Sequence, residues 1–358
     1  MKYVHVIVNT AYTAPFITLI NQNFDSSEHV FFVIRGWSED KVKIPVQDNV
    51  YPINKLGNLK YGFRLIRNLN SSKKIFIHGL FGPLLLLLLR LQPWLLRKSS
   101  WAVWGGDLYG YQYPKISLKD KFEERLRRFC IKRFSELITI KGDYDLAKKW
   151  YNATGAYKHA MYSTPLKTEE IDNVAATVQQ EKRDVLHIQI GNSAAPENNH
   201  FEMLELLKPY QQENIKIFAL LSYGVVDQYA DDVIAQGKAY FGDKFVAIRD
   251  YMNFNDFISF MNQMDIVIFN HRRQQAIGNL FLATYLKKKI FFNQESTLWY
   301  TFTEEYKINL LQTSSIQTLD FQTFSSLNDN IAAQNKQMVS AVLKEEHIIN
   351  LWAALFNK

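Results

Sequence analysis

The sequence predicts an α/β protein built from two doubly wound domains of similar size. The chain has 358 residues, more than one hydrophobic core usually organises. Short apolar runs alternate with amphipathic runs, and this alternation occurs twice along the chain. Several apolar runs end in Gly, Asn or Ser, as strands of doubly wound sheets do at the edge where ligands bind.

Each half supplies five candidate strands. In the first half they are Tyr3–Val8, His29–Ile34, Lys74–His78, Ser100–Trp104 and Glu136–Thr139. In the second half they are Val185–Ile190, Ile215–Leu220, Phe245–Ile248, Ile266–Phe269 and Lys289–Phe292. Helical segments lie between the strands, and a polar stretch precedes the second half.

We therefore expect an N-terminal domain over residues 1–165, a linker over 166–183 and a C-terminal domain over 184–336. The last segment, 337–358, is expected to be a helix that packs back on the N-terminal domain. Two such domains facing one another would leave a cleft between them.

The composition is that of a folded globular protein, with 47% apolar and 22% charged residues. Aromatic residues make up 14% of the chain, and they often line clefts that hold rings or sugars. The single cysteine, Cys130, excludes an internal disulfide. Met1 and Lys2 lead directly into an alternating strand pattern, so we predict no signal peptide and a cytosolic chain.

Two neighbouring segments suggest contact with a membrane. The apolar segment 80–96 is interrupted by Pro83, Arg90 and Pro93, so it falls short of the roughly 20 apolar residues that span a membrane. It is interpreted as a buried helix or as a face lying on a membrane.

The segment from Lys115 to Arg133 has eight basic residues against three acidic ones. Apolar residues recur in it at helical spacing, at Leu118, Phe122, Leu126, Phe129 and Phe134. It therefore predicts an amphipathic helix with a basic outer face, which is either solvated or attracted to anionic lipid. No nucleic-acid-binding motif accompanies the charge, so nucleic acid is not an expected partner.

Loops after strands of the second half suit an anion. Gly191, Asn192 and Ser193 follow a strand directly, and their backbone N–H groups, with the next helix N-terminus, could bind a diphosphate. An ordinary strand-to-helix connection is an equally good interpretation of these three residues.

The loop after the strand at 266–269 brings positive charge. Arg272 and Arg273 could recognise phosphate, Gln274 and Gln275 follow them, and Gly278 would permit close approach. The alternative is a basic loop that is merely solvated.

A third loop, after the strand at 289–292, contains Glu295. Its carboxylate could accept hydrogen bonds from sugar hydroxyls, with Trp299 nearby, although Ser296 could equally be a helix cap in this loop.

The first half offers a carboxylate and an imidazole at strand ends. His78 ends one strand, and Asp107 follows the next within the stretch WAVWGGDLYGY. On neighbouring strands they would share one rim of the sheet, where either could accept a proton from an attacking hydroxyl. Trp104 and Tyr109 could supply flat surfaces for a sugar, and Gly105 and Gly106 would permit close approach. A turn or capping role is the alternative for Asp107 and His78.

Other chemistries lack their motifs. The sequence has no P-loop, no G-x-G-x-x-G after the first strand, no G-x-S-x-G and no H-E-x-x-H. One D-x-D, Asp143 and Asp145, could hold a divalent metal, but its position before a helical pattern favours capping. We expect no metal site.

Taken together, these motifs resemble glycosyltransferase family 56, which transfers 4-acetamido-4,6-dideoxygalactose from dTDP to lipid II of enterobacterial common antigen. The resemblance runs from about Ile75 to Tyr306. It rests on FIHGLFGP, WAVWGGDLY, GNS with Asn198 and His200, Tyr223, RQQAIG at 273–278, and NQE with Trp299. It implies a GT-B architecture, two Rossmann-like domains facing a central cleft, with the nucleotide sugar held mainly by the C-terminal domain.

The chain departs from the family pattern at Ala195, where the family tends to have aspartate, and at Ser222 and Gly224 around Tyr223. Both places are on the expected donor side, so the base and sugar of the donor stay open.

The resemblance implies the following donor-binding residues: Gly191, Asn192, Ser193, Tyr223, Arg272, Arg273, Gln274, Gln275, Ile277, Gly278, Asn279 and Glu295. The expected acceptor-binding residues are Trp104, Gly105, Gly106 and Tyr109.

The resulting hypothesis is transfer of a 6-deoxyhexose from a dTDP or GDP sugar to a lipid-linked or glycan acceptor at the cytoplasmic face of the inner membrane. The nucleotide sugar is a substrate, and we expect no cofactor. The GNS loop, Arg272 or Arg273 and the helix beginning near Ile277 would stabilise the leaving diphosphate in place of a metal.

The catalytic candidates are Asp107 as general base, with His78 second, if the reaction inverts configuration. If it retains configuration, Asp107 would position the acceptor. A GT-B-like sugar-nucleotide epimerase or hydrolase and a non-catalytic membrane-associated assembly component are the alternative functions.

Overall fold

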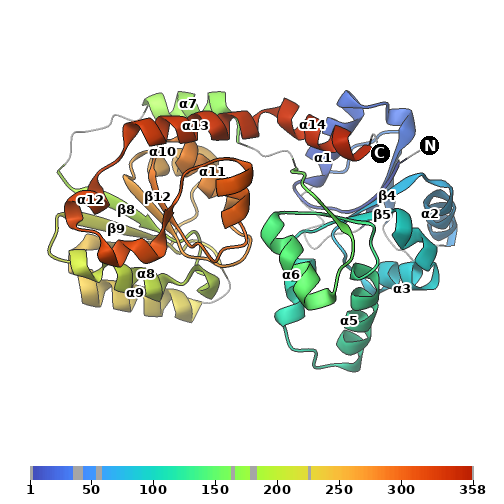
Figure 1. Ribbon diagram of the computed structural model, residues 1–358, viewed down its shortest axis with the longest axis horizontal. Coiled ribbons are helices and arrows are strands. Elements are labelled where there is room, and N and C mark those ends of the chain that lie inside the picture. Colours follow the sequence, from blue (N-terminus) through green and yellow to red (C-terminus); the bar gives the residue numbers. More distant parts are fainter. Residues whose placement is uncertain are drawn as a thin grey trace. The chain divides into compact units, whose positions relative to one another are not determined.

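The computed structural model describes residues 3–34, 43–53, 59–162, 166–177, 184–224 and 227–356. The chain forms two compact units (Figure 1), one of Met1–Ser163 with Glu345–Lys358 and the other of Thr164–Lys344. Each unit is a parallel sheet covered by helices on both faces.

The first unit contains a seven-stranded sheet with the order β3-β2-β1-β4-β5-β6-β7. Its strands are β1 (Tyr3–Val8), β2 (His29–Ile34), β3 (Val50–Ile53), β4 (Lys74–His78), β5 (Ser99–Ala102), β6 (Glu136–Ile138) and β7 (Ala156–Lys158). The five predicted strands are confirmed with shifts of at most two residues at their ends. The unpredicted β3 and β7 are edge strands of four and three residues, and β3 contains Pro52, so their apolar pattern is short and interrupted.

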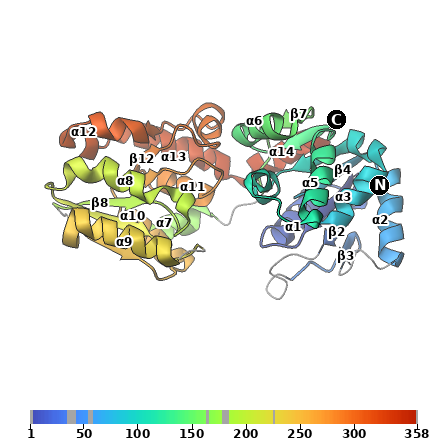
Figure 2. The ribbon, with the colours of Figure 1, turned by 90° about the horizontal axis from the view of Figure 1, so that it is seen from below.

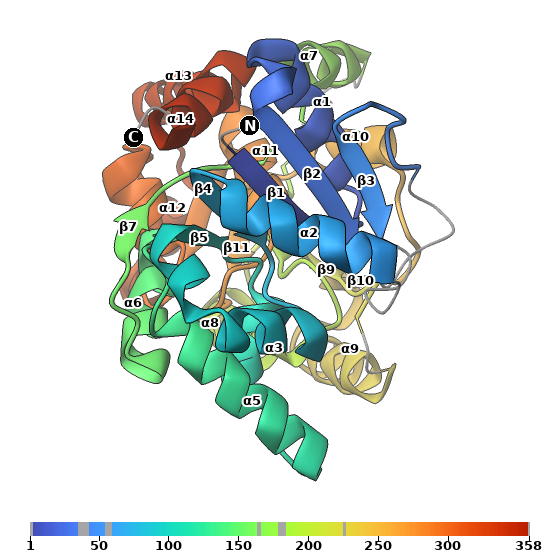
Figure 3. The same ribbon diagram turned by 90° about the vertical axis from the view of Figure 1, so that its right-hand side faces the viewer.

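Helices cover both faces of this sheet. They are α1 (Thr13–Asn23), α2 (Leu59–Ser71), α3 (Pro83–Leu91), α4 (Gly106–Tyr109), α5 (Leu118–Ile131), α6 (Lys141–Tyr151) and α14 (Glu345–Phe356). Buried side chains of α2, α3, α5 and α6 share one core, and those of α1 and α14 share another with the opposite face. Figure 3 shows α2 lying across the strands that it covers.

The chain returns to the first unit at its end. Trp352 of α14 is fully buried and donates its Nε1–H to the carbonyl oxygen of Met161 at 2.8 Å. The preceding helix, α13 (Asp329–Leu343), belongs to the second unit, where it packs against α11. The returning segment therefore begins at residue 345, later than the expected 337, because the buried side chains of α13 pack within the second unit.

The second unit contains a six-stranded sheet with the order β10-β9-β8-β11-β12-β13. Its strands are β8 (Leu186–Ile190), β9 (Ile215–Leu220), β10 (Phe245–Ile248), β11 (Ile266–Phe269), β12 (Lys289–Phe292) and β13 (Leu311–Gln312). All five predicted strands are present. The unpredicted β13 is a two-residue edge strand, too short to show a pattern.

The remaining helices of the second unit are α7 (Thr168–Thr177), α8 (His200–Leu207), α9 (Asp227–Phe241), α10 (Phe254–Asn262), α11 (Ile277–Tyr285) and α12 (Phe321–Ser325). Figure 1 shows α8 and α9 on one face of the sheet and α10, α11 and α13 on the other. Figure 2 views this unit from the side that α8 and α9 cover.

The segment expected to be a linker contains helix α7. Ile171 on α7 is fully buried, and Asp172 accepts a hydrogen bond from the hydroxyl of Tyr285 at 2.7 Å. This helix is therefore part of the second unit over its described residues. Its polar composition hid it, because only one of its side chains is buried.

The apolar segment 80–96 forms α3 and a following 3₁₀ helix, Pro93–Lys98, each with a proline at its start. Leu85, Leu86 and Leu89 are buried, whereas Leu84 and Leu91 are exposed. In the described parts of the chain, no helix is both long and apolar enough to cross a membrane.

Candidate functional site

The carboxyl ends of four neighbouring strands bring polar residues to one edge of the second sheet. β8, β11, β12 and β13 pair in parallel in that order. Gly191, Asn270, Asn293 and Thr313 follow these strands directly and are all buried. Because parallel strands end at the same edge, these residues lie together where doubly wound folds bind ligands.

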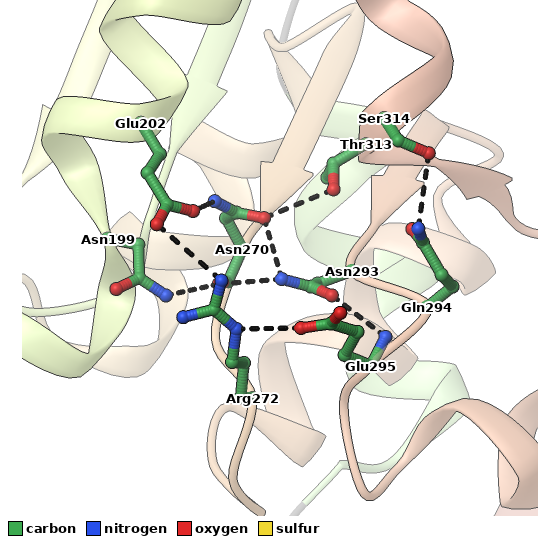
Figure 4. A network of polar contacts seen from close by, with 9 residues as sticks. All are labelled: Asn199, Glu202, Asn270, Arg272, Asn293, Gln294, Glu295, Thr313 and Ser314. Atoms are coloured by element: carbon green, nitrogen blue, oxygen red, sulfur yellow. Dashed lines mark hydrogen bonds and ion pairs between the residues drawn. The ribbon is translucent and has the colours of Figure 1, made fainter.

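Asn270 is the centre of a polar network at this edge (Figure 4). Its Nδ2 donates to Glu202 Oε2 at 2.8 Å. Its Oδ1 accepts hydrogen bonds from Asn293 Nδ2 at 2.9 Å and from Thr313 Oγ1 at 3.1 Å. Asn199 donates to its backbone carbonyl at 2.7 Å. One side chain thus connects β11, β12, β13 and α8.

Arg272 lies between two carboxylates of this network. Its Nε donates to Glu295 Oε2 at 3.0 Å, and its Nη2 lies 3.6 Å from Glu202 Oε1. All three side chains are at least half exposed. Sequence reasoning placed Arg272 and Glu295 at a donor site independently, and the structure joins them in one ion pair. The charge of Arg272 is therefore already balanced by carboxylates, which weakens its expected role on a diphosphate.

These residues line a pocket with a volume of about 590 Å³, which is called the strand-end pocket below. It is lined by Phe201, Glu202, Glu205, Leu206, Gln236, Asn270, Arg272, Asn293, Gln294, Glu295, Thr313, Ser314 and Gln317. The size lies in the range of small-molecule sites. Carboxylates and amides can bind hydroxyl groups or the polar edge of a base, and the half-exposed ring of Phe201 offers a flat apolar surface.

The GNS loop differs from the expected anion-binding loop. The backbone N–H groups of Gly191, Asn192 and Ala194 donate to Ile268 O, Asn198 Oδ1 and Tyr223 O respectively. A short 3₁₀ helix, Pro196–Asn198, separates the loop from α8. The loop therefore does not offer a run of free N–H groups at a helix start, because its own fold uses them. The Ser193 side chain is buried, and its Oγ accepts a hydrogen bond from Asn198 Nδ2 at 3.0 Å.

Tyr223 contacts the GNS loop through its side chain and its backbone. Asn192 Nδ2 donates to the Tyr223 hydroxyl at 2.9 Å, and the Tyr223 ring is half exposed. Gly224 beside it has a φ of +127°, and a Cβ there would lie 2.9 Å from the backbone of Ala194 and Ala195. Two of the departures from the family pattern, Ala195 and Gly224, are thus in direct contact.

Several buried polar atoms at this edge lack a hydrogen-bond partner among the described residues. They are Asn192 Oδ1, His200 Nε2, Arg273 Nε and Gln275 Nε2. His200 lies against the GNS loop, since a Cβ on Gly191 would lie 2.3 Å from its Nε2. Burial lowers the pKa of His200 to about 3, so its ring is neutral. Unsatisfied buried groups are costly, and a polar ligand bound at this edge could satisfy these atoms.

The start of α11 is open to a ligand. Ala276 precedes the helix with a φ of +55° and provides no side-chain cap. Gly278 is exposed, and a Cβ there would have no heavy atom within 4 Å. Ile277 and Asn279 beside it are half-buried, as is Gln274 in the preceding loop. An uncapped helix N-terminus attracts anions through its N–H groups and dipole. In the loop before this helix, Arg273 forms an ion pair with Glu197, with 3.3 Å between Nη2 and Oε1.

Asp107, in the first unit, lies in an environment that does not suit the expected general base. It is 1% exposed, and its Oδ2 accepts hydrogen bonds from Leu80 N at 2.8 Å and Trp101 Nε1 at 2.7 Å. Its Oδ1 accepts one from Trp104 N at 3.1 Å. Burial raises the pKa of Asp107, and these hydrogen bonds act against that rise. The carboxylate holds two loops together, and a substrate hydroxyl cannot reach it in this arrangement.

His78 is also buried, in a chain of histidines. His5 Nδ1 lies 3.0 Å from His78 Nε2, and His5 Nε2 lies 3.0 Å from His29 Nδ1. The other nitrogen of His78, Nδ1, lies 2.6 Å from the hydroxyl of Tyr162. Burial lowers the pKa of His78 to about 3, so the ring is neutral. Tyr162 is half-buried, whereas His78 is fully buried.

The four expected acceptor residues differ in burial: two of them reach the surface and two are buried. Gly106 is exposed, and Trp104 is half-buried with its Nε1 donating to Tyr162 at 2.8 Å. Gly105 is buried and turns the chain with a φ of +82°. Tyr109 is 5% exposed and donates its hydroxyl hydrogen to Asp143 at 2.6 Å. Tyr109 therefore packs in the core and offers no surface to a sugar.

The D-x-D pair lies inside α6 and not at its cap, which is Ile140, and Asp143 is in the first turn of the helix. Asp143 is buried against Tyr109, and Asp145 forms an ion pair with Lys141 at 2.5 Å. The described residues hold no group of three His, Cys, Asp or Glu side chains that could bind a metal ion.

Sequence reasoning missed most of the strand-end pocket, including Glu202, Asn270 and Thr313. Asn270 could have been found, because it directly follows the predicted strand at 266–269, whereas Thr313 could not, because it follows the two-residue β13. Glu202 and Glu205 could not, since they lie on α8 and reach the pocket only through the packing of that helix.

Solved structures with similar folds include several glycosyltransferases. The chain resembles a glycosyltransferase from Rickettsia africae with a TM-score of 0.65 and 12% identity, covering 99% of this chain and 98% of that one. It resembles sucrose-phosphate synthase from Thermosynechococcus elongatus with a TM-score of 0.64 and 9% identity, covering 100% and 98%. It also resembles HepE from Anabaena, in complex with UDP and glucose, with a TM-score of 0.61 and 11% identity, covering 99% of each chain.

WaaG, a glycosyltransferase involved in lipopolysaccharide biosynthesis, matches with a TM-score of 0.56 and 8% identity, covering 99% and 98%. These likenesses show the fold, which is the predicted GT-B fold of glycosyltransferases. The family described as 4-alpha-L-fucosyltransferase glycosyl transferase group 56 matches residues 19–355, almost the whole chain. The protein therefore belongs to glycosyltransferase family 56, the 4-alpha-L-fucosyltransferases.

Proposed function

We propose that this enzyme transfers a 6-deoxyhexose, fucose or its 4-acetamido form, from a nucleoside diphosphate to a lipid-linked or glycan acceptor. The reaction would take place at a membrane surface, during synthesis of a bacterial surface polysaccharide. Membership of a fucosyltransferase family supports the sugar class. The similar fold of WaaG, which is involved in lipopolysaccharide biosynthesis, supports the kind of product.

The observation that carries the donor assignment is the polar edge of the second sheet. There the strand-end pocket, the unsatisfied atoms of Asn192, His200 and Arg273 and the open start of α11 all follow neighbouring parallel strands. HepE, which has the same fold, holds UDP and glucose in its structure. A nucleotide sugar matches this combination, because it has hydroxyls, a flat base and a diphosphate.

Within this edge, we assign the nucleoside to the strand-end pocket and the diphosphate to the start of α11. Glu295 and Glu202 would accept hydrogen bonds from ribose hydroxyls. Their ion pairs with Arg272 are exposed and therefore weak, so these ion pairs would compete little with the hydroxyls. The first turn of α11, from Ile277 to Asn279, would approach the diphosphate closely because Gly278 has no side chain.

Loss of the diphosphate leaves negative charge that must be stabilised. The helix start would provide most of that stabilisation without a metal, and Arg273 would add to it if its ion pair with Glu197 opens. Activity that is unchanged by EDTA would support this arrangement, and activity that is lost on chelation and restored by a divalent cation would refute it.

On the acceptor side, we assign direct contact to Trp104, Gly106 and Tyr162, and a positioning role to Asp107 and His78. Tyr162 connects the two parts, because it accepts a hydrogen bond from Trp104 and lies 2.6 Å from His78. Asp107 would act by holding the backbone of Trp104 and Leu80 in place.

A thermal-shift panel of dTDP, GDP and UDP, each with its sugars, tests the donor assignment. A ligand that binds only the native state adds RT ln(1 + [L]/Kd), or about 2.7 kcal/mol at a hundredfold excess over Kd. The preferred nucleotide should raise the melting temperature clearly. A flat response to all three would contradict the proposal.

Turnover of the nucleotide sugar by itself separates transfer from the epimerase or hydrolase alternative. Transfer predicts little consumption of donor until a lipid-linked or oligosaccharide acceptor is added. Full turnover without an acceptor would favour the alternative.

A further inference from the structure

The first half of helix α5 carries an apolar surface that the described chain leaves uncovered. Ile116 and Leu118 are 84% and 85% exposed, and Phe122 is 53% exposed. Leu118, Phe122 and Leu126 follow one another at four-residue spacing and therefore lie on one face of the helix. That face is buried at Leu126 and at the nearby Cys130. The same stripe thus belongs to the core at one end of α5 and is open at the other.

The exposed half keeps its helical form without packing. Ser117 Oγ accepts a hydrogen bond from Asp120 N at 3.0 Å, and Asp120 Oδ2 accepts one from Ser117 N at 3.1 Å. This reciprocal capping satisfies two backbone donors at the start of the helix. The apolar side chains are therefore presented on a defined surface and are not part of a frayed end.

Positive charges outnumber negative ones around this surface, which also includes Asp120 at the start of the helix. Two of the acidic residues of α5 are neutralised within the helix, since Arg127 pairs with Glu123 at 3.2 Å and with Glu124 at 3.0 Å. Within the described part of the chain, Lys119, Lys121 and Arg125 form no ion pair, and all three are exposed. Figures 1 and 3 show α5 at the margin of the first unit, with α3 beside it.

We propose that this surface, Ile116, Leu118 and Phe122 with Lys119, Lys121 and Arg125 around them, docks on an anionic lipid membrane. Large apolar side chains would enter the interface between headgroups and acyl chains, and the cations would face the headgroups. A second copy of the same positively charged surface would be repelled, so charge favours lipid over self-association. The inference deepens the proposed function, which places the reaction at a membrane.

Sedimentation with vesicles tests the inference, and it needs no nucleotide sugar. The wild-type chain should bind vesicles of phosphatidylcholine with phosphatidylglycerol, and bind vesicles of phosphatidylcholine far less. Binding should fall in about 1 M NaCl, where charges are screened beyond ~3 Å. Leu118→Ser with Phe122→Ser, and Lys119→Glu with Lys121→Glu, should each lower the partition coefficient about tenfold or more.

Matched controls change the same residue types elsewhere. Leu327→Ser replaces an exposed apolar residue of the second unit, and Lys149→Glu with Lys238→Glu makes the same charge change on other exposed helix faces. These controls should bind vesicles as the wild type does. Equal loss in the controls, or no binding by the wild type, would overturn the inference.

Two further outcomes separate this inference from the proposed function. A chain that binds anionic vesicles through α5 but transfers no sugar would refute the function and support the surface. A chain that transfers sugar to a water-soluble acceptor but binds no vesicles would overturn the surface alone. Self-association that Leu118→Ser with Phe122→Ser abolishes, without vesicle binding, would also overturn it.

Discussion

The carboxylate of Asp107 accepts a hydrogen bond from the indole Nε1–H of Trp101 at 2.7 Å, and both side chains are buried. The same oxygen also accepts the backbone N–H of Leu80 at 2.8 Å. With the N–H of Trp104, the carboxylate accepts three hydrogen bonds, and it connects the loop after β4 to the loop after β5. These contacts favour a structural role for Asp107 over the expected role as proton acceptor.

Asp107→Asn should destabilise the first unit. The amide would present an N–H₂ group to one of three N–H donors, and an unsatisfied buried group costs about 1–3 kcal/mol. Unfolding in urea, monitored by tryptophan fluorescence, would report on this unit, because every tryptophan except Trp299 belongs to it. Unchanged stability together with a turnover loss of about 10²-fold or more would instead restore Asp107 as the general base.

Acid should destabilise both units before carboxylates titrate. Burial lowers the pKa of His78, His200 and His271 to about 3 and that of His29 to about 4. In the unfolded chain these rings take up protons below about pH 6.5, so the unfolded state binds more protons as pH falls. The free energy of unfolding should therefore decrease by about 1.4 kcal/mol per buried histidine between pH 7.5 and 5.5.

Calorimetry across this pH range would measure the effect, since the two units can unfold in separate transitions. His200→Gln removes one titrating ring from the second unit and should reduce the pH dependence of that transition only. A melting temperature that stays constant from pH 7.5 to 5.5 would contradict the neutral, buried state of these rings.

Asn270→Ala should weaken nucleotide binding. The substitution removes the side chain that bonds to Glu202, Asn293 and Thr313, so the walls of the strand-end pocket lose their common partner. We expect Kd for the preferred nucleoside diphosphate to rise about tenfold, as for loss of one to two hydrogen bonds. Isothermal titration calorimetry would measure it.

Asn214→Ala is the matched control, because Asn214 is an exposed amide bonded to the backbone of Asp184. Its affinity should equal that of the wild type. Equal affinities in all three proteins would show that the nucleotide binds elsewhere.

Gly278→Asp should have opposite effects on stability and on donor binding. A carboxylate in the first turn of α11 interacts favourably with the helix dipole, and no heavy atom lies within 4 Å of a Cβ at this position. Folding stability should be unchanged or slightly raised, whereas affinity for a nucleoside diphosphate should fall tenfold or more through charge repulsion.

Asn255→Asp adds the same negative charge to the first turn of α10 and serves as the control. It should leave nucleotide affinity unchanged. If Gly278→Asp also binds the nucleotide normally, the diphosphate does not approach the start of α11.

Sequence pattern was sufficient for the two-unit α/β fold, because strands and helices follow from the local periodicity of apolar residues. It located all ten main strands and the loops at their carboxyl ends, including the GNS loop and the separate loops of Arg272 and Glu295, but not the contact between Arg272 and Glu295. It failed at short edge strands such as β13 and at α7, where too few side chains are buried to leave a pattern.

What each polar residue does was decided only by the tertiary structure. Asp107 and Leu80 are 27 residues apart and His5 and His78 are 73 apart, so no local pattern could show that these groups satisfy one another. The same holds for α5, whose sequence predicts a continuous apolar face that packing covers at Leu126 and leaves open at Leu118. Periodicity is a local property of the chain, whereas burial and hydrogen bonding depend on which distant segments the fold brings together.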